Sequence, residues 1–248
     1  MDVRGNIEEI FDSVQAEGPF AGIRQVFIRF AGCNLSCAFC DTPQAKKPVA
    51  TCRFEIKSAG GQFEYLPNPL SVEEVREAIG RLWKQGYHSI SITGGEPLVQ
   101  ADFLLQLLPA LRNDGHEIYL ETNATYPEQM QTISRYVSYV AADIKISSCS
   151  GEPNRFDENV KFLEASGSSY LFVKIVVTDR VDEGEFLEAV RLASKAGDVR
   201  CVVIQPARTR RGDIAVGTHT LLELQRRALE IHPDVRVIPG LQQSLRIS

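Results

Sequence analysis

The chain has 248 residues, of which 44% are hydrophobic and 24% are charged, and its formal net charge is −5. This length suits one α/β domain or two small domains, and it can bury a sizeable core. The mild acidity argues against nucleic-acid and anionic-membrane partners, and no apolar run reaches the length of a membrane span.

The chain begins with an acidic segment, residues 1–13, where a secretory signal would be apolar, so we expect a cytoplasmic protein. Strand-like and helical patterns then alternate, which predicts βα units and a mostly parallel sheet. With no repeat or linker, we expect a single domain over 1–248, folded as an incomplete barrel or an open twisted sheet. The seven strand-like runs are 24–30, 89–92, 117–121, 139–144, 170–177, 200–205 and 235–238.

Regular helices are predicted between several of these runs. The first opens with Ser71 and Glu74 at capping-box spacing, and the second contains Pro109. The predicted helices are 71–86, 101–115, 182–197 and 218–233.

Three cysteines, Cys33, Cys37 and Cys40, follow the first strand-like run. A structural zinc would need a fourth cysteine or histidine, and the four histidines are distant in the sequence. A 4Fe–4S cluster with three thiolate ligands would instead leave one iron open to a substrate or cofactor. Three thiols packed in a core are the alternative. The scattered cysteines Cys52, Cys149 and Cys201 are expected to be small buried thiols.

An insertion at about 43–70 separates the cysteine loop from the first predicted helix. Its segment 52–66 predicts a β-hairpin, with Ala-Gly-Gly at the turn. We expect this hairpin to cover the cysteine loop.

Polar residues follow many of the strand-like runs. In parallel α/β folds the active site lies at the carboxyl edge of the sheet, where such strand ends converge. Turn formation alone explains the glycines and prolines there. It explains less well the polar set that would share this rim, which is Glu96, Glu121, Asn123, Asp143, Lys145 and Gln205.

The cysteine spacing, with Phe39 before the last cysteine, resembles that of the radical S-adenosylmethionine (radical SAM) superfamily. In that superfamily the open iron binds SAM, and reductive cleavage yields a 5′-deoxyadenosyl radical. The segment 92–97, Ile-Thr-Gly-Gly-Glu-Pro, resembles the glycine motif that meets the SAM amino group. The resemblance implies an incomplete (β/α) barrel of radical SAM type, with about six or seven mostly parallel strands.

Further segments resemble the 7-carboxy-7-deazaguanine synthase family over nearly the whole chain. That family converts 6-carboxy-5,6,7,8-tetrahydropterin into 7-carboxy-7-deazaguanine with loss of ammonia, on the route to queuosine. It uses SAM, a 4Fe–4S cluster and Mg²⁺. The matching segments are 10–22, 26–43, 91–98, 120–127, 142–151, 173–177, 203–207 and 235–239.

This resemblance implies roles for individual residues. Cys33, Cys37 and Cys40 would hold the cluster, and the Thr42 hydroxyl would bind Mg²⁺. The implied SAM contacts are Phe39, Asp41, Gly94, Gly95, Glu96, Asp143, Ile144, Lys145 and Gln205. The implied substrate contacts are Val14, Gln15, Ala16, Arg29, Thr93, Glu121 and Asn123. No catalytic side chain is implied beyond the cluster and SAM.

Several of these residues have plainer alternatives. Arg29 could meet a substrate carboxylate with its planar fork or form an ordinary surface ion pair. Glu121 and Asn123 suit a pterin edge, but they could equally make strand-end turn contacts. Asp41 and Thr42 could be no more than a turn or a cap.

The chain departs from the family pattern at five positions. Ala16 and Ala124 stand where the family has glycines, and Gly240, Gln242 and Gln243 lie where it has Pro-Gln-x-His-Lys. A methyl group is costly where the backbone has a positive φ, and elsewhere it would narrow the pocket. Loss of His-Lys would weaken the recognition of an anionic substrate unless another cation compensates.

Three other functions are possible. A paralogous radical SAM enzyme would act on a related heterocycle, and a glycyl-radical activase would need a broad open face for a protein partner. A non-catalytic zinc- or cluster-binding module would leave the 93–97 motif unexplained. As partners, the family resemblance implies a homodimer, a pterin-like small molecule and an electron donor such as flavodoxin or ferredoxin.

Overall fold

The computed structural model describes residues 3–58, 60–167, 169–209 and 211–245, apart from the side chains of residues 243 and 244. Its described strands form one sheet in the order β10-β9-β8-β7-β6-β5-β2-β1-β3-β4. The strands are β1 (Ile7–Val14), β2 (Arg24–Phe30), β3 (Thr51–Glu55), β4 (Phe63–Pro67), β5 (Ser89–Gly94), β6 (Ile118–Thr122), β7 (Tyr139–Asp143), β8 (Tyr170–Val177), β9 (Val199–Pro206) and β10 (Val235–Val237).

The seven strands β2 and β5–β10 run parallel to one another, which confirms the predicted mostly parallel sheet. Each of them falls on one of the predicted strand-like runs. The strand β1, which the sequence did not predict, pairs antiparallel with β2. The sheet remains open, because β10 and β4 are its two edges.

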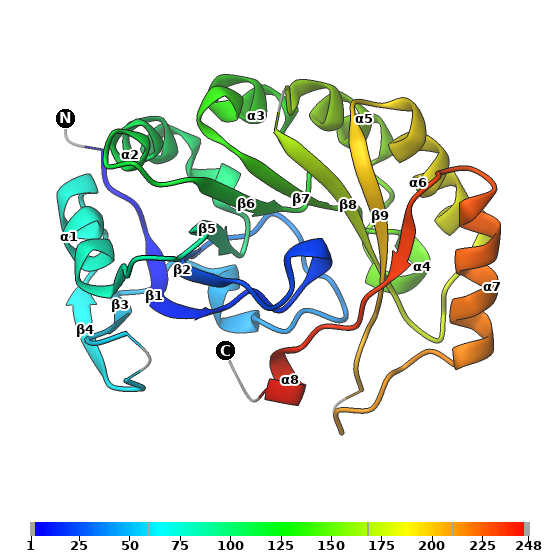
Figure 1. Ribbon diagram of the computed structural model, residues 1–248, viewed down its shortest axis with the longest axis horizontal. Helices are drawn as coiled ribbons and strands as arrows, with labels where there is room; N and C mark the ends of the chain where they lie inside the picture. Colours follow the sequence, from blue (N-terminus) through cyan, green and yellow to red (C-terminus); the bar gives the residue numbers. More distant parts are fainter. Residues whose placement is uncertain (1–2, 59, 168, 210, 246–248) are drawn as a thin grey trace.

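The helices α2, α3, α5, α6 and α7 follow the outer face of this sheet, whereas the loop between β1 and β2 and the helix α8 lie on its inner side (Figure 1). The predicted capping box at Ser71 and Glu74 is present, and α1 ends at Leu82 because Trp83 leaves helical geometry. No helix in the described ranges combines the length and the apolar character that a bilayer crossing requires. The helices are α1 (Val72–Leu82), α2 (Ala101–Asn113), α3 (Pro127–Ile133), α4 (Ser147–Ser150), α5 (Phe156–Ala165), α6 (Glu183–Lys195), α7 (Thr218–Leu229) and α8 (Gln242–Leu245), with 3-10 turns η1 (Gly18–Phe20), η2 (Pro43–Lys46), η3 (Pro97–Gln100) and η4 (Ser134–Tyr136).

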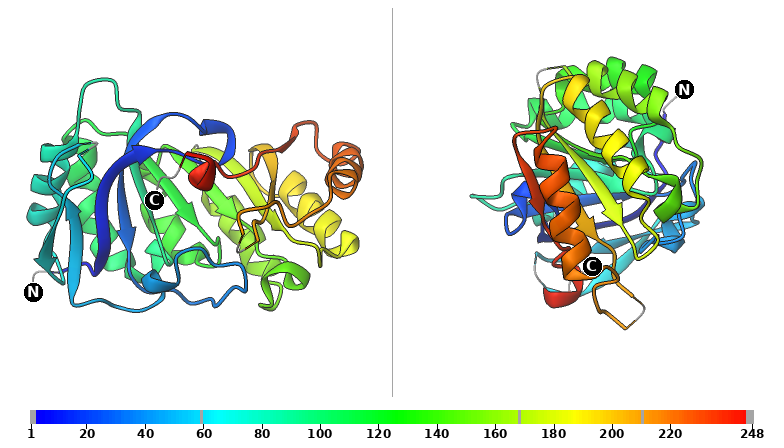
Figure 2. Two further views of the ribbon diagram at one scale, coloured as in Figure 1. Left: turned by 90° about the horizontal axis from the view of Figure 1, so that it is seen from below. Right: turned by 90° about the vertical axis from the view of Figure 1, so that its right-hand side faces the viewer.

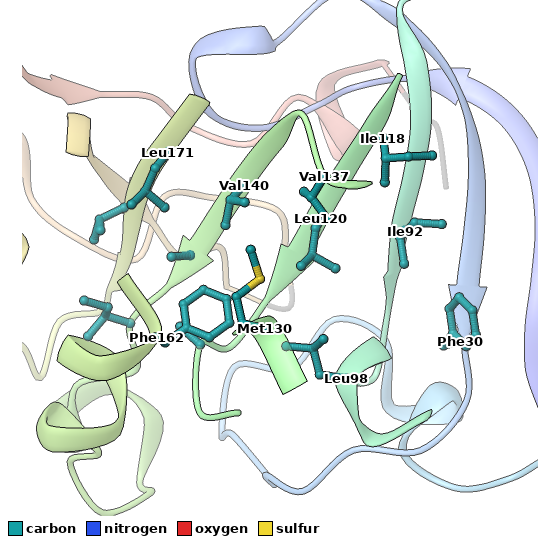
Figure 3. Packing of buried hydrophobic residues seen from close by; sticks show 14 of the residues in the cluster. Phe30, Ile92, Leu98, Ile118, Leu120, Met130, Val137, Val140, Phe162 and Leu171 are labelled. Atoms are coloured by element: carbon teal, nitrogen blue, oxygen red, sulfur yellow. The ribbon is translucent and has the colours of Figure 1, made fainter. Parts of the chain in front are cut away.

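The main core lies between the sheet and the outer helices. Strand residues such as Ile92, Leu120 and Val140 point toward Met130 and Phe162 on the helices (Figure 3). Because side chains alternate along a strand, the opposite side chains of the same strands face inward. There they form a small apolar layer, which is Tyr119, Ala141, Phe172, Cys201 and Val203.

The insertion forms the predicted hairpin but not the predicted cover. Strand β3 pairs with β1, and β4 becomes the edge of the sheet beside α1, where Arg81 and Glu64 form a 3.0 Å ion pair. The hairpin therefore extends the sheet instead of covering the cysteine loop. The turn η2 takes that place, since the Gly32 N–H donates to the Ala45 carbonyl at 2.8 Å.

Candidate active site

The carboxyl ends of the parallel strands surround a cavity of about 520 Å³, a volume typical of small-molecule sites. The loop between β1 and β2 meets the residues just before α8 beside this cavity. There the Leu241 N–H donates to the Ala16 carbonyl at 2.9 Å (Figure 2). The expected site residues that line the cavity are Val14, Gln15, Ala16, Arg29, Cys33, Cys37, Phe39, Cys40, Asp41, Thr42, Thr93, Gly94, Gly95, Glu121, Asn123, Asp143, Lys145 and Gln205.

Two expected SAM contacts, Glu96 and Ile144, do not line the cavity. The Glu96 carboxylate turns inward and accepts hydrogen bonds from the Thr122 hydroxyl at 2.8 Å and the Asn123 N–H at 2.7 Å. Its burial raises the pKa of Glu96 to about 7. Ile144 is fully buried in the main core. Glu96 therefore joins the ends of two strands and presents no carboxylate to a ligand, and the Ile144 side chain presents no surface to one.

The two glycines of the 92–97 motif permit close backbone packing. A Cβ atom on Gly94 would lie 2.2 Å from the Phe30 carbonyl oxygen, and one on Gly95 would lie 2.2 Å from the Gly32 carbonyl oxygen. Gly94 also has a φ of 143°, in the region that favours glycine. The resemblance implies that this motif meets SAM, but the nearest neighbours of the two glycines are the backbone of Phe30 on β2 and of Gly32 in the loop that leads to the cysteines.

The cysteine loop is anchored on two sides. The Ala38 N–H donates to the Ser150 carbonyl at 2.8 Å, and the Asn123 amide donates to Asn34 Oδ1 at 2.8 Å. The three thiols line the cavity and are partly exposed, whereas Cys52, Cys149 and Cys201 are buried as predicted.

The three thiols on the cavity wall are the candidate metal ligands of the site. Within the described ranges, no three Cys, His, Asp or Glu side chains converge closely enough to hold one ion, and no histidine lines the cavity. A single zinc needs its thiolates at about 2.3 Å from one ion. A 4Fe–4S cluster can be held by three thiolates, and Cys33, Cys37 and Cys40 on the cavity wall would be its ligands.

Four charged side chains of alternating sign run along the cavity wall, and we call them the charge ladder: Lys145, Asp143, Lys174 and Glu17. Asp143 bonds Lys145 at 2.6 Å and Lys174 at 2.9 Å, and Lys174 also pairs with Glu17. Burial opposes ionisation of Glu17, but Lys174 and amide donors outweigh it and lower its pKa to about 2. Lys145 lies 5.0 Å from the centre of the Phe39 ring.

The sequence interpretation missed Lys174 and Glu17. The signal for Lys174 was a lysine inside the apolar run 170–177, because a charge on the inner face of a strand needs a buried partner. Glu17 lies beside the expected contact Ala16, but its partner is 157 positions away along the chain.

On the substrate side, Glu121 accepts hydrogen bonds from Gln15 at 2.8 Å and from Ser91 and Thr93 at 3.1 Å each. Burial, together with the nearby Glu17 carboxylate, raises the pKa of Glu121. Arg29 bonds Glu9 through Nε at 2.8 Å, and its side chain is only 12% exposed. This pair is therefore part of the cavity wall and is no ordinary surface ion pair.

The alternative to a ligand contact was a turn contact for Asn123 and a turn or helix cap for Thr42, and the two residues differ in how well this alternative holds. The Asn123 side chain lines the cavity but also makes turn contacts, since Oδ1 accepts from the Thr125 hydroxyl at 2.6 Å. Thr42 precedes η2, yet its side chain makes no capping hydrogen bond there. Thr42 lines the cavity next to the exposed Asp41. An oxygen ligand for a hard cation is thus available at Thr42.

Of the residues that depart from the family pattern, Ala124 lies in the main core, whereas Ala16, Gly240 and Gln242 line the cavity. Ala124 has a φ of 57° and is fully buried, so it occupies the left-handed conformation that favours glycine. Ala16 has no positive φ, and it lines the cavity. The Gln242 amide donates to Glu17 at 2.9 Å, and Gly240 lies on the wall. The Gln243 side chain lies outside the described residues.

A parallel sheet with three thiols on the loop after its first parallel strand, facing a small-molecule cavity, has the architecture of radical SAM enzymes. A family model described as the Radical SAM superfamily matches residues 27–206.

Curated relatives narrow this class. The chain is 40% identical over 237 residues to the 7-carboxy-7-deazaguanine synthase of Geobacter sulfurreducens, covering 94% of both chains. It is 37% identical over 237 residues to the 7-carboxy-7-deazaguanine synthase of Thermococcus kodakarensis, covering 90% of both. The crystal structure of QueE from Escherichia coli shares the fold, with a TM-score of 0.60 at 22% identity over 94% of this chain and 92% of that one. The chain belongs to the 7-carboxy-7-deazaguanine synthase family.

Proposed function

We propose that this chain converts 6-carboxy-5,6,7,8-tetrahydropterin into 7-carboxy-7-deazaguanine with loss of ammonia, in 7-deazapurine (queuosine) biosynthesis. One observation carries the proposal: the three thiols and the wall formed by Arg29, Thr93 and Glu121 face one cavity of about 520 Å³. This volume fits a small heterocycle beside a cofactor, whereas an activase needs an open face for a polypeptide.

The side chains present suit the cofactors of this reaction. Cys33, Cys37 and Cys40 would hold a 4Fe–4S cluster, and Thr42 would bind Mg²⁺. When bound, the cluster and SAM supply a 5′-deoxyadenosyl radical. The residues that would contact SAM are Phe39, Asp41, Gly94, Gly95, Asp143, Lys145 and Gln205, together with the backbone beside Ile144.

The chain's own residues would orient the pterin. Arg29 bonds Glu9 through Nε, and its terminal nitrogens make no other hydrogen bond among the described residues, so they can receive the substrate carboxylate. Glu121, held by three donors, offers its remaining acceptor capacity to pterin N–H groups. Val14, Gln15, Ala16, Thr93 and Asn123 complete that wall.

Four further properties belong to the proposal. We infer a single domain over 1–248 with its insertion at about 43–70, a homodimer, an electron donor such as flavodoxin or ferredoxin, and a cytoplasmic location. The family resemblance supports the dimer and the donor, and light scattering and reduction assays would test them.

The first experiment tests SAM cleavage. Anaerobically reconstituted protein should be brown and should release 5′-deoxyadenosine from SAM under dithionite. Cys33→Ala, Cys37→Ala and Cys40→Ala should each abolish this product because each removes a cluster ligand. Cys149→Ala, a buried thiol beneath the same loop, should retain it. Retention in the three variants and loss in Cys149→Ala would overturn the ligand assignment.

The second experiment tests the substrate. Wild-type protein with the carboxytetrahydropterin, SAM and Mg²⁺ should yield a product with the mass of 7-carboxy-7-deazaguanine. SAM cleavage without this product would favour a paralogue acting on a related heterocycle. Glycine at 16 and 124 and His-Lys at 242 and 243 would then test whether these departures changed the specificity.

A further inference from the structure

A row of cross-strand neighbours runs from the insertion hairpin to the cavity. In the strand register, Glu9 on β1 lies between Arg53 on β3 and Arg29 on β2. Arg29 in turn lies opposite Thr93 on β5. Glu9, Arg29 and Thr93 line the cavity, whereas none of the residues of β3 or β4, all of which are described, does so. This row therefore connects the hairpin to the candidate substrate wall through Glu9.

The Glu9 carboxylate divides its two oxygens between the two arginines. Oε1 accepts a hydrogen bond from Arg29 Nε at 2.8 Å, and Oε2 lies 3.7 Å from Arg53 Nη1. The Glu9 side chain is only 7% exposed, so its charge depends on these two partners more than on water. Arg53 is itself held by the hairpin, since its guanidinium lies 3.8 Å from the centre of the Phe63 ring on β4.

This division decides how much of Arg29 is left for a ligand. A carboxylate and a guanidinium commonly bond at two points. Because Arg53 attracts Oε2, Glu9 bonds Arg29 through Nε alone, and the terminal nitrogens of Arg29 stay available for a second carboxylate. Without Arg53, Oε2 would be drawn to Arg29, and one of these nitrogens would be lost to a contact within the protein.

A second carboxylate adds to this competition. Glu8 lies at the register shift of β1, next to Glu9. Burial and the Glu9 charge raise the pKa of Glu8, whereas Arg29 and Arg53 oppose this rise. Two arginines thus serve two neighbouring carboxylates, and loss of Arg53 would leave Arg29 as the cation for both.

We propose that Arg53 is a positioning residue of the insertion hairpin, which keeps Glu9 from bonding Arg29 at two nitrogens and so leaves the Arg29 fork open to the carboxylate of the pterin. The inference rests on the proposed function and deepens it. It gives the hairpin a role in selecting carboxylated over uncarboxylated pterins, although the hairpin lies outside the cavity.

The test compares two ligands on the reconstituted holoenzyme with SAM and without reductant: the carboxytetrahydropterin, and tetrahydropterin, which lacks the carboxylate. In Arg53→Gln we expect the Kd for the carboxylated ligand to rise about tenfold, and the Kd for tetrahydropterin to change less than about twofold. Under turnover, the KM should rise about tenfold with kcat within about twofold. Arg53→Lys should stay within about threefold of the wild type, because its ammonium still attracts Oε2.

A double-mutant cycle with Glu9→Gln tests the route of this effect. A glutamine side chain has one acceptor oxygen, so it cannot bond Arg29 with two oxygens as a carboxylate can. In the Glu9→Gln background, Arg53→Gln should therefore raise the Kd for the carboxylated pterin less than about threefold. Losses that simply multiply would show that Arg53 acts independently of Glu9, and they would overturn the inference.

Arg81 on α1 provides the matched control. It also makes an ion pair, with Glu64 at 3.0 Å, and a ring contact, 4.6 Å from the centre of Phe54, and both partners belong to the same hairpin. Arg81→Gln should lower the melting temperature by an amount similar to Arg53→Gln and leave both Kd values unchanged. If it raised the Kd for the carboxylated pterin equally, loss of hairpin stability would be the cause, and the inference would fail.

The two proposals fail in different ways. A wild type that binds the carboxylated pterin more tightly than tetrahydropterin, with the same preference in Arg53→Gln, would overturn the role of Arg53 alone. A wild type that binds neither pterin would overturn the proposed function as well.

Discussion

The backbone of Ala124 is in the left-handed region, with a φ of 57°, and its methyl group is fully buried. Glycine there would relieve about 1–2 kcal/mol of strain. It would also lose about 0.8 kcal/mol of methyl burial and about 0.5–1 kcal/mol through chain entropy. These effects nearly cancel, so we expect Ala124→Gly to change the free energy of unfolding by less than about 1 kcal/mol.

A second alanine provides the comparison for this prediction. Ala142 on β7 is equally buried in the same core but has no positive φ. Ala142→Gly therefore loses the methyl burial and the entropy without any relief of strain, about 1–2 kcal/mol in total. Denaturant unfolding of both variants measures the difference, and equal losses would contradict strain at Ala124.

Among the elements, η1 closes the amino-terminal end of the barrel interior and supports the N-terminal part of the cavity wall. Its Phe20 ring lies 5.0 Å from the rings of both Tyr139 and Tyr170 and also contacts the inner layer around Phe172. The same turn directly follows the wall residues Gln15 and Glu17. We expect Phe20→Ala to cost about 2–4 kcal/mol and to raise the KM for the pterin several-fold, because this wall loses its support.

The control for η1 is a destabilising change in another element. Phe54 on β3 is fully buried, and it lies in the hairpin away from the cavity. Phe54→Ala should cost about 3–5 kcal/mol and leave the KM unchanged. Thermal unfolding and steady-state kinetics on both variants test this, and an unchanged KM in Phe20→Ala would show that η1 has no effect on the site.

Local sequence patterns predicted which strands, helices and turns form better than they predicted where these elements lie in the fold. The strands, the capped α1 and the hairpin follow from alternation, capping residues and turn residues, which act within about ten positions. The sequence did not predict β1 because its acidic residues look solvent-exposed. In the fold Glu9 is buried through pairing with Arg29, 20 positions away. The position of the hairpin likewise depends on its pairing with β1, which no local signal specifies.

The candidate site was predictable to the extent that topology alone determines it. Parallel strands bring their carboxyl ends together, so Glu121, Asp143 and Gln205 were correctly expected on one rim. The direction of a side chain beyond the last strand residue depends on loop contacts. That is why Glu96, one such residue, was wrongly expected to face a ligand. The pairing of Glu17 with Lys174 joins residues 157 positions apart and has no local signature.

For the whole molecule, Glu96 links stability to pH. Burial raises its folded-state pKa from 4.5 to about 7, so the folded protein holds this proton more tightly than the unfolded chain. The contribution of Glu96 is therefore fully present below about pH 4.5 and is lost as the pH rises to about 7. The loss amounts to at most about 3 kcal/mol.

The neutral variant Glu96→Gln isolates this contribution. The free energy of unfolding is measured anaerobically for the wild type and the variant at several pH values. The stability advantage of the wild type should shrink as the pH rises from 5 to 7.5. Parallel curves would mean that the Glu96 carboxyl titrates alike in the folded and unfolded chains.

The charge ladder also limits how this enzyme can diversify. Asp143 and Lys174 each hold two oppositely charged neighbours, so neutralising one of them strands the others in a poorly hydrated place. Single mutations there would be purged, and only compensated pairs would survive. Ala16, Gly240 and Gln242, three of the positions that differ from the family pattern, line the cavity but are not members of the ladder. New substrate preferences can therefore evolve stepwise at these wall positions while the charge ladder stays unchanged.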